Sequence, residues 1–214
     1  MNGKSAMEKL LNRYPELCAC RESIETLTAA MLELYRAGGT LFCCGNGGSA
    51  ADCDHICGEL LKGFLSKRPL KEEERKNFAR HFGSEGEELA AKLQGGLPAV
   101  SLLSHPALLS AFANDVDPDL GFAQQVYAQG RPGDLLLGIS TGGGALNVRC
   151  ALMAARAKGM KTALLTGNRH GICESYADIV VAVPESETFR IQELHLPIYH
   201  YLCAAVEAEM FPEA

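Results

Sequence analysis

The chain has 214 residues, of which 47% are hydrophobic and 21% are charged, and it contains no tryptophan. This length and composition predict one globular domain over 1–214, large enough to bury a sizeable core. The formal net charge of −6 argues against a nucleic-acid partner, which would favour a basic surface, and no apolar run approaches the ~18–20 residues that span a bilayer.

The nine cysteines lie mostly within apolar segments. This usage is typical of buried thiols in a reducing compartment rather than of a disulfide framework. No Cys-x-x-Cys pair occurs, which disfavours a structural zinc site. Residues 1–17 lack the apolar core of a signal peptide. We therefore expect a cytoplasmic protein without a membrane partner.

The N-terminal segment 1–38 predicts a pair of helices, because apolar residues recur at helical spacing on both sides of Pro15. Gly38 and Gly39 are expected to end the second helix. The apolar run over 40–44 then predicts a buried strand, which a helix follows.

Residues 67–95 form a strongly charged segment in which acidic and basic side chains alternate in blocks. Such a pattern is typical of a solvated face. We predict a charged helical insertion over 67–95, with His81 facing water.

From residue 97 onward, short apolar runs alternate with helical stretches. Continuous leucine and β-branched runs between helices predict strands buried on both faces, hence an α/β fold with a doubly wound, five-stranded parallel sheet flanked by helices. Right-handed crossovers are expected to join the strands. The remaining strands are predicted at 98–103, 133–140, 161–166 and 178–183, and the helices at 106–113, 119–129, 145–158 and 188–211.

A glycine-rich turn directly follows the first predicted strand and opens a helix. At such a junction unpaired backbone amides and the positive helix end point at one spot, which makes an anion site. The candidate phosphate-binding residues of this turn are Asn46, Gly47, Gly48 and Ser49. One turn further along, His55 and Glu59 are four residues apart and share a helical face.

Two other interpretations of this turn remain open. The sequence also satisfies the loose G-x-G-x-x-A pattern of a dinucleotide fold, which requires an acidic residue about 20 positions later. Residues 62–68 stand there, and they are basic and not strand-like. The other alternative is a tight strand–helix turn that binds no ligand.

A second strand and turn at 136–145 repeat the pattern of 42–50. In an open parallel sheet, ligands bind beyond the carboxyl ends of strands near a topological switch point. The hydroxyls of Ser140 and Thr141, with the backbone of Gly142, can therefore hold the same anionic ligand as the first turn.

The last predicted helix carries a polar cluster that includes Gln192, His195 and His200. His195 and His200 are about 140° apart around a helix, so they cannot both point into one site. Gln192 and His200 can face a ligand together. A histidine on such a helix is otherwise a core or interface residue.

Three segments together resemble the sugar isomerase (SIS) domain family, in its phosphoheptose isomerase branch. They are GNGGSAAD with His55 and Glu59, LLLGISTGG, and the terminal RIQELHLPIYH. The likeness covers 1–66 and 97–211. It implies a SIS-type fold that interconverts a ketose phosphate and an aldose phosphate, with no nucleotide cofactor. It also implies a homotetramer whose active sites lie at subunit interfaces.

The resemblance assigns roles to individual residues. Glu59 and His200 match the family's catalytic acid–base pair, and Ser49, Ser140 and Thr141 match its phosphate-holding residues. The positions that hold zinc in some members are His55, Glu59, Gln192 and His200. The family's phosphate turn usually carries two further hydroxyls where this chain has Gly142 and Ala145, and Phe189 stands where an aspartate is usual.

The implied chemistry suits these residue types. Aldose–ketose isomerisation through an enediol needs a carboxylate base near carbon and an acid near oxygen, in a site that excludes water. A zinc ion would instead polarise the carbonyl, and it would compete for Glu59; we favour Glu59 as the base. The alternative function is a non-catalytic SIS module that binds a sugar phosphate or a protein partner.

Overall fold

The structure, a computed structural model, describes residues 3–212 and contains one parallel sheet with the strand order β2-β1-β3-β4-β5. All four pairings in this sheet are parallel. The predicted five-stranded, doubly wound sheet is therefore confirmed. The strands are β1 (Leu41–Gly45), β2 (Ala99–Ser101), β3 (Leu135–Ile139), β4 (Lys161–Thr166) and β5 (Ile179–Ala182).

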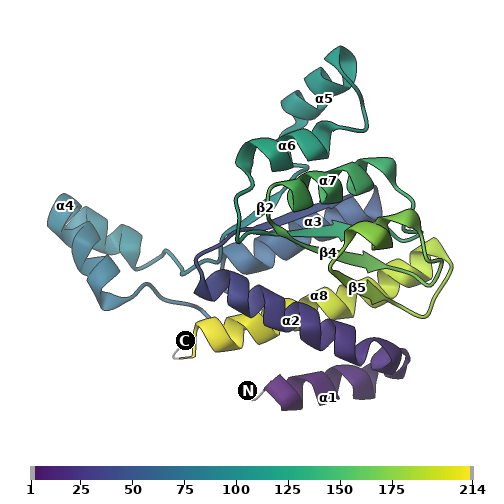
Figure 1. The fold of residues 1–214 in the computed structure, drawn as a ribbon. Helices are drawn as coiled ribbons and strands as arrows, with labels where there is room; N and C mark the ends of the chain where they lie inside the picture. Colours follow the sequence, from purple (N-terminus) through teal and green to yellow (C-terminus); the bar gives the residue numbers. More distant parts are fainter. Residues whose placement is uncertain (1–2, 213–214) are drawn as a thin grey trace.

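Helices cover both faces of the sheet (Figure 1). Helices α2, α3 and α8 lie on one face with α1 outside them, and α6 and α7 lie on the other, with α5 projecting beyond α6. The α-helices are α1 (Gly3–Arg13), α2 (Arg21–Arg36), α3 (Gly48–Leu61), α4 (Glu72–Ala90), α5 (Pro106–Asp115), α6 (Gly121–Gln129), α7 (Leu146–Ala157) and α8 (Thr188–Met210), and the 3₁₀ helices are η1 (Pro15–Cys20) and η2 (Ile172–Tyr176).

The strands are buried on both faces because successive side chains point to opposite sides. Leu41 and Cys43 pack into the core beneath α2, α3 and α8, whereas Phe42 and Cys44 pack into the core beneath α6 and α7. This is why the strands appear in the sequence as continuous apolar runs rather than as an alternating pattern.

The strand order creates a switch point beside β1. The chain passes from β1 to the edge strand β2, then crosses back to place β3 on the other side of β1. In sheets of this type, ligands bind outside the carboxyl ends of the strands at this point. The two glycine turns of the sequence follow β1 and β3, so they lie at adjacent strand ends.

The predicted N-terminal helical pair is found as α1 and α2, with η1 between them. Both helices pack against α8, and Leu17, Ile24 and Leu27 are fully buried. Strand β2 is shorter than the predicted 98–103, because the chain turns after Ser101, whose carbonyl accepts a hydrogen bond from Ser104 N–H (3.1 Å).

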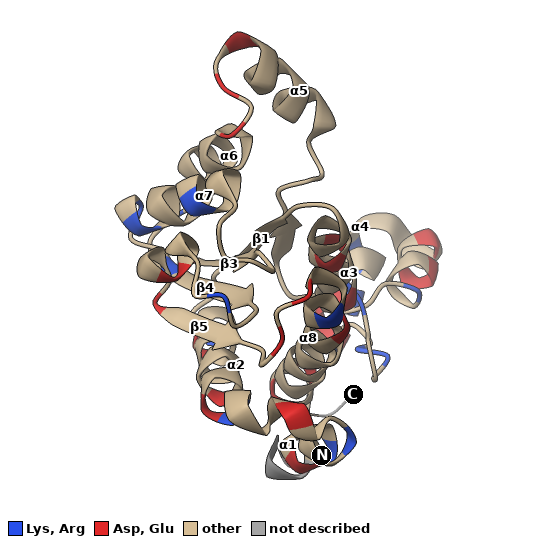
Figure 2. Ribbon diagram, turned by 90° about the vertical axis from the view of Figure 1, so that its right-hand side faces the viewer, with Lys and Arg blue, Asp and Glu red and all other residues tan. Residues whose placement is uncertain are grey.

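The charged insertion forms α4, which projects from the body of the protein and is kinked at Gly83 (φ 58°). Figure 2 shows acidic and basic residues side by side on it, and His81 is exposed, as predicted. One boundary is wrong: Arg68, placed in the solvated segment 67–95, is completely buried. Within residues 3–212, no helix is long and apolar enough to cross a membrane.

Candidate functional site

The first glycine turn joins β1 to α3 through a conformation that favours glycine. Gly47 has φ 56° and ψ −121°, a region that side chains with a Cβ rarely enter. The Ser49 N–H donates to the Asn46 carbonyl (3.1 Å), and the Ser49 side chain is buried. The turn therefore places the start of α3, with its positive helix end, directly after the carboxyl end of β1.

The second turn follows β3 and is held by hydrogen bonds to the carboxyl end of the neighbouring strand, β4. The Ser140 N–H donates to the Leu165 carbonyl (3.0 Å), and the Thr141 carbonyl accepts a hydrogen bond from Gly167 N–H (3.0 Å). Ser140 is buried, whereas Thr141 and Gly142 are half-buried at the edge of the turn.

A pair of asparagine side chains ties the two turns together. Asn46 Nδ2 donates to Asn147 Oδ1 (2.9 Å), and Asn147 Nδ2 donates back to Asn46 Oδ1 (2.8 Å). Asn147 lies in the first turn of α7. The two hydrogen bonds therefore connect the first glycine turn to the helix that follows the second glycine turn. The two candidate phosphate loops thus form one continuous polar edge.

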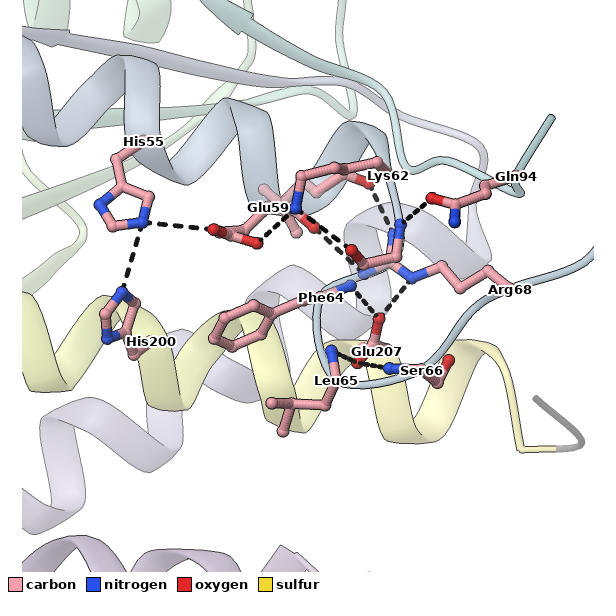
Figure 3. A network of polar contacts seen from close by, with 12 residues as sticks. His55, Glu59, Lys62, Phe64, Leu65, Ser66, Arg68, Gln94, His200 and Glu207 are labelled. Carbon is pink, nitrogen blue, oxygen red and sulfur yellow. Dashed lines mark hydrogen bonds and ion pairs between the residues drawn. The ribbon is translucent and has the colours of Figure 1, made fainter. Parts of the chain in front are cut away.

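The structure brings three predicted side chains of α3 and α8 together (Figure 3). His55 Nε2 lies 3.3 Å from Glu59 Oε1 on α3 and 3.4 Å from His200 Nε2 on α8. Burial, together with the neighbouring His55 ring, lowers the pKa of His200 below its usual range. His200 is therefore neutral at pH 7.

Gln192 lies on α8, two turns before His200, and its side-chain amide reaches the start of α3. Its Nε2 is only 2.6 Å from the place where a Cβ on Gly48 would stand. His195 points elsewhere, as the helix geometry predicts: it is fully buried, with Nε2 3.2 Å from the Thr166 carbonyl. Burial lowers the pKa of His195 to about 4.

Lys62 is a cation that the sequence interpretation did not place in the site. Its Nζ lies 3.0 Å from Glu59 Oε2 and 3.2 Å from the Gly63 carbonyl (Figure 3). Glu59 thus has an ammonium group on one oxygen and an imidazole on the other. The Lys62 side chain is 59% exposed, so the site is open on this side.

The donors around Glu59 are of the kinds that zinc prefers. The two separations from His55 Nε2, 3.3 and 3.4 Å, are close to the ~3.3 Å ligand–ligand distance of tetrahedral zinc with bonds of ~2.0–2.1 Å. Within residues 3–212, however, no three His, Cys, Asp or Glu side chains are arranged to hold a metal ion. Lys62 already pairs with Glu59. Zinc binding stays a prediction.

Some residues of the site could not be identified from the sequence. Asn147 and Lys62 stand next to predicted motifs, but only the fold shows that their side chains meet Asn46 and Glu59. Tyr199 was assigned no role in the predicted site, yet its hydroxyl reaches His55. The only sequence signal for Lys62 is its position three residues after Glu59 on α3, where it can pair on one helical face.

Gly48→Ala is expected to lower activity without unfolding the protein. The new methyl group would displace the flexible Gln192 side chain rather than backbone. Gly58→Ala is the matched control on the same helix: Gly58 has no heavy atom near its Cβ position, so alanine is expected to stabilise the protein by roughly 0.5–1 kcal/mol. Turnover and thermal unfolding of both variants check this. Equal turnover in the two variants would contradict it.

Comparisons with known proteins show which family this chain belongs to. A model of the SIS domain family matches residues 100–205. The phosphoheptose isomerase of Roseiflexus sp. is 36% identical over 200 residues, covering 90% of this chain and 88% of the relative.

Solved structures give the same result. The phosphoheptose isomerase of Neisseria gonorrhoeae superposes with a TM-score of 0.71 at 31% identity, covering 96% of this chain and 91% of that one. That of Francisella tularensis has a TM-score of 0.74 at 28% identity and covers 95% of each chain. These matches extend over the N-terminal helices and both glycine turns. The chain therefore belongs to the phosphoheptose isomerase family of SIS-domain proteins.

Proposed function

We propose that this chain is an isomerase that interconverts a ketose phosphate and an aldose phosphate, with sedoheptulose 7-phosphate and heptose 7-phosphate as the substrate pair. One observation carries the proposal: Glu59 and His200, on helices far apart in the sequence, converge on His55 beside two joined glycine turns. The relatives, named phosphoheptose isomerases, are similar over most of their length.

The reaction moves one proton between two neighbouring carbons and another between their oxygens. Glu59 takes the proton from the carbon next to the carbonyl, while His200, neutral at pH 7, exchanges a proton with the sugar oxygens. The resulting enediol regains its carbon-bound proton from Glu59 at the neighbouring carbon. Lys62 lies close enough to Glu59 to stabilise its carboxylate before the first step and after the last.

The phosphate group is held away from the reacting carbons. The hydroxyls of Ser49, Ser140 and Thr141, with the amides at the start of α3, supply donors for its oxygens. Asn46 stays bonded to Asn147 and keeps the two turns in register. The Gln192 amide lies beside Gly48, and we assign it a place between the phosphate turn and the acid–base pair.

The assay with sedoheptulose 7-phosphate tests this function directly. We expect formation of the aldose phosphate and incorporation of solvent deuterium at carbon. Ketose phosphates with five and six carbons, run in parallel, test whether Gly142, Ala145 and Phe189 alter the choice of sugar. Binding of these sugars without any deuterium exchange would instead support the non-catalytic module.

We also propose that the chain forms a homotetramer with sites at subunit interfaces. Helix α5 contains no buried residue although its sequence, PALLSAFAND, is largely apolar. Val116 after it and Phe82 on α4 are also exposed. Exposed apolar surface of this extent is typical of an interface. Light scattering of the purified protein gives the mass, and a monomer at micromolar concentration would contradict the proposal.

Metal removal distinguishes the two roles of Glu59. Because Lys62 pairs with Glu59, we expect the protein to keep its turnover within about twofold after dialysis against a chelator, with Glu59 acting as a free base. If turnover is lost and zinc restores it, His55, Glu59, Gln192 and His200 are the residues to assign as ligands, and Glu59 is not the base.

A further inference from the structure

A buried tyrosine hydroxyl lies directly behind His55. Tyr199 precedes His200 on α8 and is 1% exposed. Its Oη is 3.1 Å from His55 Nδ1 and 3.2 Å from Asp52 Oδ1. The His55 and Tyr199 rings meet edge to face, with centroids 5.3 Å apart and planes at 72°. His55 is therefore held from behind, on the side away from Glu59.

The hydrogen-bond inventory of this trio allows one arrangement. A phenol has one proton to donate, and a carboxylate can only accept. Tyr199 donates that proton to Asp52, so its oxygen can only accept from His55. The hydrogen of a neutral His55 must then lie on Nδ1.

The Asp52 carboxyl group makes no side-chain hydrogen bond among the described residues other than the one from Tyr199. Its Oδ2 is buried with no partner among the described residues. An incompletely satisfied buried carboxylate is costly, which suggests that its single bond to Tyr199 is functional.

We propose that Tyr199 is a positioning residue that fixes His55 as the Nδ1–H tautomer. The inference rests on the proposed function, because it concerns the groups around the proposed base. In this tautomer the His55 Nε2 lone pair faces Glu59 Oε1, 3.3 Å away, and His200 Nε2, 3.4 Å away.

The tautomer matters because the opposite one would block the base. A hydrogen on His55 Nε2 would be donated to Glu59 Oε1, and a carboxylate that accepts this bond is a weaker base toward carbon. Next to a carboxylate, that is the tautomer an unrestrained imidazole would adopt. Tyr199, supported by Asp52, opposes it. Glu59 Oε1 then stays available for the substrate proton while Oε2 is paired with Lys62, and once Oε1 is protonated it can donate to Nε2.

Nitrogen NMR of the intact protein tests the tautomer without any need for turnover. The protein is labelled with ¹⁵N-histidine, and the His55 signals are assigned by their loss in His55→Gln. At pH 7.5 we expect the Nδ1–H pattern for His55. Tyr199→Phe keeps the ring and removes only the hydroxyl, and we expect it to shift His55 toward the Nε2–H form.

Tyr35→Phe is the matched control. The Tyr35 hydroxyl is also buried, but it has no partner among the described residues. We expect Tyr35→Phe to leave the His55 signals and the turnover unchanged. We expect Tyr199→Phe to lower kcat by about tenfold, with KM within about twofold, as is usual when a residue that orients a functional histidine is lost.

Two results would overturn the inference. One is a wild-type His55 that is the Nε2–H tautomer or doubly protonated at pH 7.5, which decides the matter even if Tyr199→Phe fails to fold. The other is a folded Tyr199→Phe with an unchanged tautomer. Lack of isomerase activity in the wild-type protein, together with an Nδ1–H His55, would refute the proposed function and leave the tautomer assignment standing.

Discussion

Replacing Glu59 with glutamine is expected to lower kcat by about 10²–10⁴-fold, because an amide cannot take a proton from carbon. Glutamine keeps the volume of the side chain and an oxygen that Lys62 can bind, so we expect the fold and substrate binding to persist. Turnover of sedoheptulose 7-phosphate and deuterium uptake from solvent measure the effect. Both should fall together, since they depend on the same proton transfer.

Glu72→Gln is the control for the Glu59 variant. Glu72 also forms an i,i+4 pair on a helix, with Lys76, but on the exposed insertion α4. We expect its turnover to equal that of the wild type. If Glu59→Gln keeps more than a tenth of wild-type turnover, Glu59 is not the base, and the proton transfer at carbon must be assigned to another group.

The second large effect concerns the buried ion pair between Arg68 and Glu207. Arg68 Nε donates to Glu207 Oε1 (2.6 Å), and the same carboxylate accepts hydrogen bonds from the amides of Phe64, Leu65 and Ser66 (Figure 3). The Arg68 guanidinium also donates to the Leu60 and Glu59 carbonyls at the end of α3. The Arg68 side chain thus caps the C-terminal end of α3, the helix that carries the proposed base.

Arg68→Met is expected to destabilise the protein by about 3–5 kcal/mol, because it leaves Glu207 buried without its partner charge. Urea denaturation measures the change. The double variant with Glu207→Gln should recover part of the loss, since no unpaired charge then remains. Arg36→Met removes an exposed pair with Glu209 on the same helix, and should cost at most about 1 kcal/mol. Equal losses for Arg36→Met and Arg68→Met would contradict this account.

The same ion pair predicts a pH dependence of stability. Burial acts to raise the pKa of Glu207, but the amides of Phe64 and Leu65 and the charge of Arg68 outweigh it and lower the pKa below its usual range. A carboxyl with a lowered pKa stabilises the fold above its unfolded-state pKa of ~4.3 and loses that contribution as the pH falls through the folded value. In Arg68→Met, the acid side of the stability profile should be flatter.

The local sequence pattern was sufficient to predict the sheet and the positions of the two glycine turns. Continuous apolar runs predict buried strands, and the glycine turns that follow two of these strands predict an anion site. Both signals can be recognised because each lies within a few residues of sequence. The proposed acid–base pair could not be found in this way, because four of the five strands lie between Glu59 and His200 in the sequence. The family resemblance supplied their pairing.

Long-range partners explain what the sequence did not reveal. Arg68 lies next to a charged segment and was placed in the solvated insertion, since a charge run normally faces water. Its partner Glu207 is 139 residues away, on the last helix. Tyr199 and Asp52 meet across 147 residues, and neither position is marked by a local motif.

The strand order also affects how the chain is made. The interior strand β1 is synthesised first, but one of its neighbours, β3, begins at Leu135, about 90 residues after β1 ends. At about 5–20 residues per second, a ribosome needs roughly 5–20 s to supply that neighbour. During this interval the apolar, cysteine-bearing edge of β1 has no partner on that side, so newly made chains should require chaperone protection until the middle of the domain has emerged.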